Sequence, residues 1–149
     1  MSRWTRQAGR ISPLTVFGAS AVVLLGVGFF FAQESVGTVG SKFMDALARG
    51  DVTRLTEMSY MADLPREEIR KKWDFTVNKA APYYRFTWNI AGANETKDGT
   101  GNVRLKVQRN IESGGAYDEN FQLPLIKTND GWKVDVRSIS RDMYPGLPR

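Results

Sequence analysis

The chain has 149 residues, enough for one domain of ordinary size but not for two independent cores. It contains neither Cys nor His, which excludes disulfides, Cys nucleophiles, Ser-His-Asp arrangements and imidazole ligands for zinc, haem or chlorophyll magnesium. Lys and Arg number 21 against 16 Asp and Glu, but three of these cations lie in a ten-residue head, so the remainder lacks the concentrated basic surface expected of a nucleic-acid-binding domain.

A cytoplasmic basic head is predicted for residues 1–10, and a transmembrane helix is predicted for residues 11–32. Residues 11–32 carry no charge, and a helix of that length spans about 33 Å, enough for the hydrocarbon core of a bilayer. The arginines precede this run, and Glu34 is the first charge after it. The positive-inside rule then places residues 33–149 outside the cytoplasm. We expect a single-pass protein of the cell (inner) membrane, in contact with lipid, with a periplasmic or other extracytoplasmic domain. The arginines of the head are Arg3, Arg6 and Arg10.

A cleaved signal peptide would show a similar pattern and is the alternative to a retained signal-anchor. The apolar run is longer than the roughly 7–15 residues of a signal h-region, and Phe30 is too bulky for a cleavage site after Ala32. Retention is therefore favoured. Small residues suit either a helix-packing face or the ordinary glycine content of a membrane helix, and no G-x-x-x-G motif is present. The candidate packing residues are Gly18, Ser20, Gly26 and Gly28.

Three helices are predicted after the anchor. Apolar residues at helical spacing end at Gly50, which is a typical helix stop. Asp51 is typical of the N-cap of a short second helix. Pro65, followed by two acids, begins a third helix, which ends before Pro82.

After the third helix the pattern changes to the alternation of half-buried strands, separated by glycine-containing turns. Pro124 favours an edge position or a bulge for the third strand. Residues 141–149 have no period, contain two prolines and are predicted to form an extended tail. The four predicted strands cover residues 84–90, 103–107, 117–125 and 132–136.

Two segments of the domain resemble a known family. The sequence LARGDV of Leu47–Val52 resembles the joint between the first two helices of the nuclear transport factor 2-like (SnoaL-like) superfamily, and Asp130–Val134 resembles its last strand. The resemblance in order and spacing covers residues 36–140. It implies an α+β fold in which three helices pack on a curved antiparallel sheet of about four strands, often around a pocket. The predicted organisation is a single N-terminal transmembrane helix followed by such a domain over residues 33–140.

The resemblance implies no particular function, because the superfamily includes isomerases, hydratases, cyclases, ligand carriers and structural interaction modules. The His common in its cyclases and hydratases is missing here. We therefore predict no catalytic residue, cofactor or metal ligand. The aromatic residues expected to line a pocket are Trp73, Tyr84, Phe86, Trp88 and Tyr117. The extended tail is expected either to be disordered or to dock on a partner, and the residues that would dock are Met143, Tyr144 and Leu147.

The leading hypothesis is a non-catalytic accessory or scaffold subunit of a larger membrane complex, which could be secretory, respiratory or photosynthetic. Its partners would be the other subunits, contacted through the external domain and tail. One alternative is a membrane-tethered module that binds a small apolar ligand. A second is an isomerase-like acid–base enzyme, which would need a buried carboxylate beside a tyrosine hydroxyl. The residues considered for that chemistry are Tyr60, Asp74, Tyr84 and Tyr117.

Overall fold

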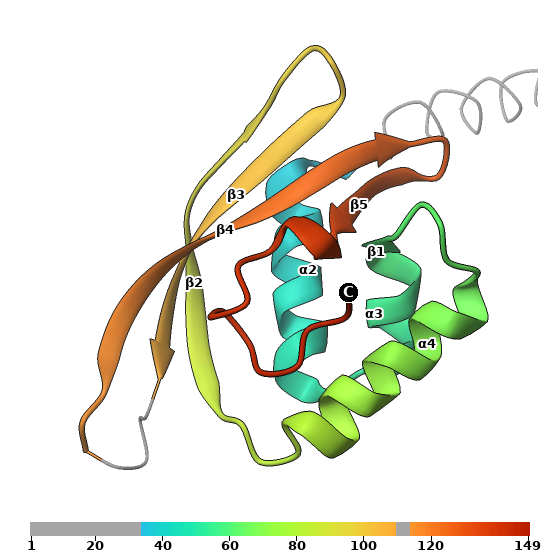
Figure 1. Cartoon of the computed structure of the whole chain (residues 1–149). Helices are drawn as coiled ribbons and strands as arrows, with labels where there is room; N and C mark the ends of the chain where they lie inside the picture. Colours follow the sequence, from blue (N-terminus) through green and yellow to red (C-terminus); the bar gives the residue numbers. More distant parts are fainter. Residues whose placement is uncertain (1–33, 110–113) are drawn as a thin grey trace, which may run out of the picture. The chain divides into compact units, whose positions relative to one another are not determined.

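A computed structural model describes residues 34–109 and 114–149, in which three helices lie on the concave face of a curved sheet (Figure 1). Residues 34–149 form a compact unit of their own. Within the described ranges no helix is long and apolar enough to cross a membrane. The predicted head, the anchor and the packing residues Gly18, Ser20, Gly26 and Gly28 lie outside these ranges.

Local signals in the sequence place the first two helices. Helix α2 (Val36–Arg49) ends at Gly50, whose φ of 68° is the left-handed conformation that glycine adopts without a steric penalty. Helix α3 (Val52–Met58) follows Asp51, whose side chain accepts a hydrogen bond from the Arg54 backbone N–H at 3.1 Å. Both boundaries agree with the prediction.

The third helix changes its winding before it ends. Helix α4 (Arg66–Phe75) begins directly after Pro65 and buries Trp73 completely. It continues into a π-helical turn, η1 (Thr76–Ala80), closed by a 3.0 Å hydrogen bond from the Ala81 N–H to the Thr76 carbonyl. π-turns are uncommon and are frequently found at functional sites. The third helical region therefore has the predicted extent, with an unpredicted change of winding at Thr76.

The sheet has five strands in the order β1-β5-β4-β3-β2. The prediction of about four antiparallel strands is corrected by β1, which pairs in parallel with β5. Two residues are too few to show an alternating pattern, so β1 is defined only by its long-range partner. The strands are β1 (Ser59–Tyr60), β2 (Phe86–Glu95), β3 (Thr100–Arg109), β4 (Tyr117–Thr128) and β5 (Gly131–Asp135), and a 3₁₀ turn, η3 (Val136–Ser138), follows the last.

Pro124 does not mark an edge strand, because β4 lies between β3 and β5. It stands opposite Asn102 of β3, while pairing with β5 involves Leu125 and the residues after it. Pro124 therefore lies beyond the last residue paired with β5, where one side of β4 is free. A missing backbone N–H is tolerated at such a position.

Helix α2 packs against the centre of the sheet. Val103, Leu105 and Val107 of β3 alternate on the concave face and are at most 1 % exposed. An added Cβ on Gly40 of α2 would lie 2.8 Å from Val103 Cγ2, so the helix approaches the strand more closely than a side chain would allow. A fully buried large apolar side chain stabilises a fold by about 1.5–3 kcal/mol. The close contact between α2 and β3 is thus part of the hydrophobic core.

Candidate functional site

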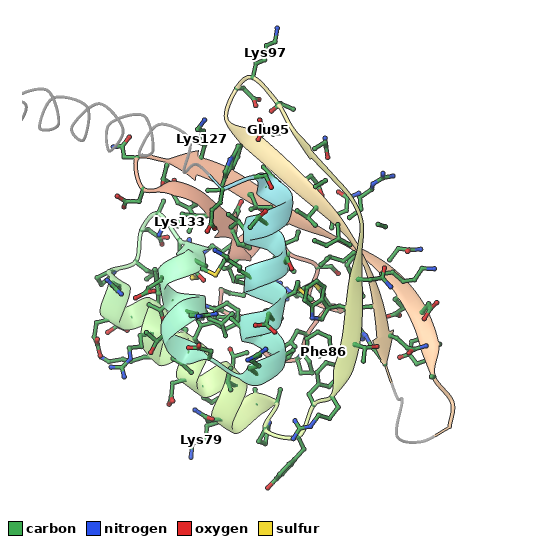
Figure 2. All side chains as sticks on the ribbon, turned by 180° about the vertical axis from the view of Figure 1, so that it is seen from behind. Lys79, Phe86, Glu95, Lys97, Lys127 and Lys133 are labelled. Carbon is green, nitrogen blue, oxygen red and sulfur yellow. The ribbon has the colours of Figure 1, made fainter. Side chains whose placement is uncertain are left out.

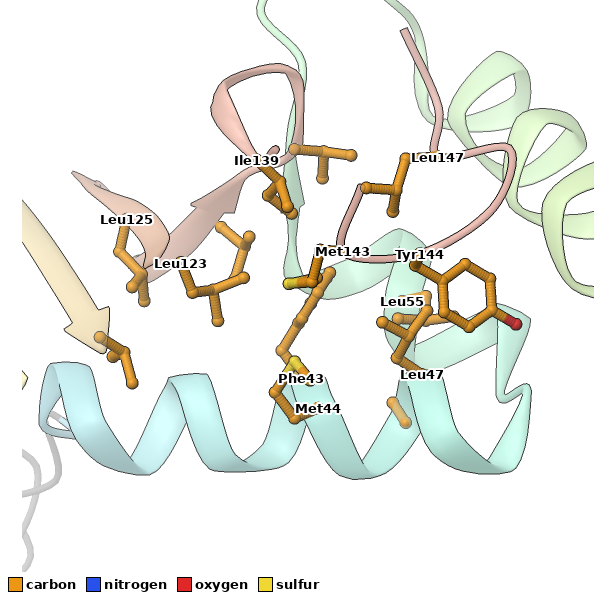
Figure 3. Packing of buried hydrophobic residues seen from close by; sticks show 14 of the residues in the cluster. Phe43, Met44, Leu47, Leu55, Leu123, Leu125, Ile139, Met143, Tyr144 and Leu147 are labelled. Carbon is orange, nitrogen blue, oxygen red and sulfur yellow. The ribbon is translucent and has the colours of Figure 1, made fainter. Parts of the chain in front are cut away.

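The C-terminal segment, residues 139–149, enters the concave side of the sheet and completes the core. Met143 and Tyr144 are only 2 % and 4 % exposed, and they belong to the same buried cluster as α2 and β3. Figure 3 shows Met143 and Leu147 on the side of the core opposite Phe43. The prediction that Met143, Tyr144 and Leu147 dock on a partner is therefore corrected: these side chains pack into their own domain, because their apolar surface complements the open side of the sheet.

A hydrogen bond from the π-turn holds the middle of this segment. The Thr76 hydroxyl donates to the Gly146 carbonyl at 2.5 Å and lies 3.0 Å from the Lys72 carbonyl. Gly146 has a φ of 67°, and an added Cβ there would lie 2.5 Å from the Ala80 Cβ. Only glycine fits this position, because both the backbone conformation and the close approach to η1 exclude a side chain.

Arg149 holds the end of the segment. Its guanidinium donates to the carbonyls of Ile139 at 2.9 Å and Val136 at 3.4 Å, and also to that of Arg137. These carbonyls belong to η3 and the residue after it; the Val136 carbonyl also accepts from the Ile139 N–H at 3.2 Å. The segment is therefore fastened at both of its ends and in its middle.

Three aromatic rings meet where the segment crosses β2. The Tyr144 ring lies edge-on to Tyr84 at 5.1 Å and to Phe86 at 5.9 Å between centroids. Figure 2 shows Phe86 on the α2 side of β2. Burial raises the pKa of Tyr84 above its ordinary value of 10.0, and its hydroxyl is buried without a hydrogen-bond partner among the described residues. The polar atoms of the three side chains are the hydroxyls of Tyr84 and Tyr144, of which only that of Tyr84 is buried without a partner among the described residues.

A charged pair lies on the same concave face. Arg109 Nη2 is 3.0 Å from Glu119 Oε2, an ion pair without the alignment of a hydrogen bond. The guanidinium also lies 5.0 Å from the Phe121 ring centroid and donates to the Asp142 carbonyl of the C-terminal segment. The Arg109 side chain is only 14 % exposed, so these partners offset much of the free energy of removing the charge from water. The pair binds the segment to β3 and β4.

The five aromatic residues predicted to line one pocket are not brought together. Trp73 is buried under α4, where its Nε1–H donates to the Ser59 hydroxyl at 2.8 Å. Tyr117 is 45 % exposed, and Trp88 is half-buried on β2. Tyr84 and Phe86 do meet, but Tyr144 occupies the space that they face. The prediction of a shared pocket is thus corrected, because the chain's own C-terminal segment fills that side of the sheet.

The residues considered for acid–base chemistry are also dispersed. Asp74 is exposed on α4 and accepts a hydrogen bond from Asn78 Nδ2 at 2.8 Å. Tyr84 has no hydrogen-bonded carboxylate in the described part of the chain. In the part of the chain that the structure describes, no group of three or more acidic side chains could hold a metal ion.

An open groove lies outside the core, between α4 with its π-turn and the C-terminal segment. Its volume is about 480 Å³, within the range of ligand and peptide sites. Its walls include the apolar Phe75, Leu147 and Pro148, and cationic residues lie along its rim. The complete lining is Lys71, Lys72, Phe75, Thr76, Gly146, Leu147, Pro148 and Arg149.

The sequence interpretation missed Arg109 and Glu119 as site residues. The signal was present, because strand alternation places Arg109 two residues after the buried Val107 and Glu119 two residues before Phe121. A charge at an inward-facing position is uncommon and marks a site. No comparable signal existed for Thr76 or Gly146, since their contact joins segments 70 residues apart.

Comparisons with known proteins place the fold. No family model matches the chain, and no curated protein matches it. A domain of unknown function with a cystatin-like fold from Nostoc punctiforme is similar over 67 % of this chain and 70 % of its own, with 13 % identity and a TM-score of 0.50. A ketosteroid isomerase-like protein from Erwinia carotovora atroseptica is similar over 65 % of this chain and 85 % of its own, with 14 % identity and a TM-score of 0.47.

A third similar structure is a nuclear transport factor 2-like protein of unknown function from Shewanella oneidensis. It covers 65 % of this chain and 88 % of its own, with 13 % identity and a TM-score of 0.45. At such identities the likeness concerns the fold alone. The structure confirms the expected α+β fold, with three helices on a five-stranded mixed sheet, and the Nostoc punctiforme domain shares this fold.

Proposed function

We propose that the protein is a non-catalytic accessory or scaffold subunit of a larger membrane complex. Residues 11–32 anchor it in the membrane, and the domain of residues 34–149 contacts neighbouring subunits outside the cytoplasm. The complex is secretory, respiratory or photosynthetic. The work of such a subunit is to hold partners in place, which requires a rigid surface and no reactive group.

The filled concave side of the sheet is the observation that carries this proposal. Met143, Tyr144 and Leu147 occupy the space where an enzyme or carrier of this architecture would receive its ligand. The segment is held there by hydrogen bonds to backbone carbonyls from the side chains of Thr76, Arg109 and Arg149. A ligand entering this space would have to displace four buried apolar side chains at about 1.5–3 kcal/mol each. Ile139 is the fourth of these buried side chains, beside Met143, Tyr144 and Leu147.

The two alternatives have less support. A small-ligand module of this fold needs an aromatic pocket of more than about 300 Å³ on the concave side of the sheet, whereas Tyr84 and Phe86 face the Tyr144 ring there. The groove of about 480 Å³ lies outside the core, and Phe75 is the one aromatic residue among the described residues of its lining. An acid–base enzyme needs a carboxylate in hydrogen-bond reach of a tyrosine, whereas the Tyr84 hydroxyl has no partner within residues 34–109 and 114–149. Neither alternative explains why the C-terminal segment is fastened so firmly.

The test of the scaffold role is purification of the tagged full chain from its native membranes in mild detergent, followed by native mass spectrometry. We expect it to elute with other polypeptides in a fixed stoichiometry. A tagged chain that lacks residues 1–33 serves as the control for association through the domain alone. Elution of the full chain only as a free monomer would overturn the scaffold role.

The anchor is tested separately, by extraction of the membranes with alkaline carbonate and by the intact mass of the mature chain. A retained anchor keeps the chain in the membrane pellet, with a mass that includes residues 11–32. A chain that is released by carbonate and begins after Ala32 would instead identify a cleaved signal peptide.

A further inference from the structure

The groove beside α4 combines an exposed aromatic ring with buried apolar walls. Phe75 is 60 % exposed, although the other large apolar residues of α4 face the core. Leu147 is 7 % exposed, and Pro148 is also buried; both contribute to the opposite wall. An exposed large aromatic residue next to an apolar hollow is typical of the central contact of a protein–protein interface.

The groove continues into a second hollow of about 280 Å³, with which it shares Gly146, Leu147 and Arg149. Arg141 lines this second hollow. The two hollows lie along the same stretch of the C-terminal segment, so an occupant of both would be extended. An extended peptide has this shape, whereas a flat lipid surface cannot enter a hollow.

Cations predominate around both hollows. Lys71 is paired with Glu68 at 2.9 Å, but among the described residues no ion pair involves Lys72, Arg141 or Arg149. The Arg149 guanidinium binds neutral carbonyls only. The pKa of the Asp63 carboxyl is lowered by its hydrogen bond with Arg137 and also by the nearby Lys72. None of the three cations, however, is held in a close ion pair among the described residues, so an acidic occupant could pair with them directly. Electrostatic complementarity of this kind directs partner choice and accelerates association.

The walls of the groove are held in place before any partner arrives. The Thr76 hydroxyl fixes the Gly146 carbonyl at 2.5 Å, and the guanidinium of Arg149 binds the carbonyl of Ile139 at 2.9 Å. A preformed site loses less conformational entropy on binding than a flexible one. The C-terminal segment therefore completes the core on one side and forms a binding wall on the other.

We propose that this groove docks an extended segment of another subunit in which apolar side chains alternate with Asp or Glu. The inference rests on the proposed scaffold function and names its contact surface. The apolar side chains of the partner enter the hollow beside Phe75. Its carboxylates lie against Lys72, Arg141 and Arg149.

The test replaces Phe75 by the photo-crosslinking residue benzoylphenylalanine in the full chain, in native membranes. The matched control carries the same residue at Tyr83, an aromatic position that is 86 % exposed and lies outside the groove lining. After irradiation, the crosslinked peptide is sequenced by mass spectrometry. We expect the Phe75 probe, and not the Tyr83 probe, to label a protein segment that contains both acidic and apolar residues.

A second step measures the affinity of the identified segment, made as a synthetic peptide, for the full chain in detergent. Lys72→Glu is expected to weaken binding by about tenfold, because it replaces an attraction with a repulsion. Lys79→Glu is the control, since Lys79 projects from η1 outside the groove lining (Figure 2). If Lys72→Glu and Lys79→Glu weakened peptide binding equally, the proposed charge complementarity would be overturned.

Four further outcomes would overturn the proposal: labelling of lipid alone, of a basic segment, of a second copy of this chain, or of nothing. The scaffold function is tested independently by co-purification. A stable complex without a Phe75 crosslink would refute the groove and leave the scaffold role standing. Absence of any complex would refute the scaffold role itself.

Discussion

Tyr84 has a hydroxyl that its surroundings do not use. The ring packs well against Tyr144 and Phe86, but the buried oxygen has no hydrogen-bond partner among the described residues. A buried hydroxyl without a partner loses its hydration without compensation, at about 1–3 kcal/mol. The aromatic ring and its polar atom thus act on stability in opposite directions.

Replacing Tyr84 by Phe is therefore expected to stabilise the domain. The ring contacts remain, and the unpaired hydroxyl is removed, so the free energy of unfolding should rise by about 1 kcal/mol at neutral pH. Tyr83→Phe is the control, because Tyr83 is 86 % exposed and its hydroxyl reaches water. Chemical denaturation of both variants measures the difference. A clear loss of stability in Tyr84→Phe would mean that the hydroxyl makes a contact outside the described residues.

Tyr144 is expected to limit stability at alkaline pH. Burial raises its pKa above the ordinary 10.0, so the folded state binds the phenolic proton more tightly than the unfolded state does. The contribution of the protonated Tyr144 to the free energy of unfolding is fully present below pH 10.0, and it is lost as the pH rises through the raised pKa. Denaturation at increasing pH should show a smaller alkaline loss in Tyr144→Phe than in the wild type. Tyr83→Phe should follow the wild type, and an unchanged slope in Tyr144→Phe would contradict this linkage.

Among the structural elements, η1 and the C-terminal segment hold each other in position. Gly146 brings the segment against Ala80, and Thr76 of the same π-turn binds the Gly146 carbonyl. The α-helical spacing of α4 predicts the helix but not the π-turn, because the change in winding serves a contact with a segment far along the chain. The function of η1 is therefore visible only in the folded structure.

Gly146→Ala is expected to destabilise the domain by about 2 kcal/mol. The new Cβ would lie 2.5 Å from the Ala80 Cβ, and the φ of 67° is unfavourable for alanine. Gly115→Ala is the control, since no atom of the residues that the structure describes lies within 4 Å of its added Cβ. Thermal unfolding of the two variants gives the comparison. Equal melting temperatures for Gly146→Ala and the wild type would show that the segment can move away from η1 without loss.

At the scale of the whole molecule, the segment after η3 completes the core. Four of the buried apolar residues of the cluster come from it: Ile139, Met143, Tyr144 and Leu147. Their burial stabilises the fold by about 1.5–3 kcal/mol each, which is comparable with the 5–15 kcal/mol net stability of a typical domain.

Removal of residues 139–149 is therefore expected to abolish cooperative unfolding. Removal of residues 1–33 should leave the cooperative transition of the domain intact, because residues 34–149 form a compact unit of their own. Circular dichroism during heating distinguishes the two truncations. A sharp transition in the chain without residues 139–149 would contradict the structural role of the segment.

The sequence predicts those parts of the fold that local chemistry determines. Asp51 and Gly50 mark helix boundaries through hydrogen bonds and backbone angles within a few residues, and alternation marks the three long strands. The buried tail has no such signal: Met143, Tyr144 and Leu147 follow no period, and their burial depends on α2, α4 and β2. The site was predicted in part for the same reason, since Tyr84 and Phe86 were identified while Tyr144 was assigned to a partner.

The parallel pairing of β1 with β5 has a consequence for the order in which the domain folds and for the rate at which it unfolds. Ser59 pairs with Val134, and nearby the ion pair of Asp63 and Arg137 joins residues 74 apart. The helices and the β2–β3–β4 meander can form from neighbours in the chain, whereas this edge closes only after the intervening chain has been ordered. Because loop-closure entropy must be overcome before such contacts contribute, we expect this edge to close after the rate-limiting transition state of folding. We therefore expect mutations in β1 to accelerate unfolding while leaving the refolding rate nearly unchanged.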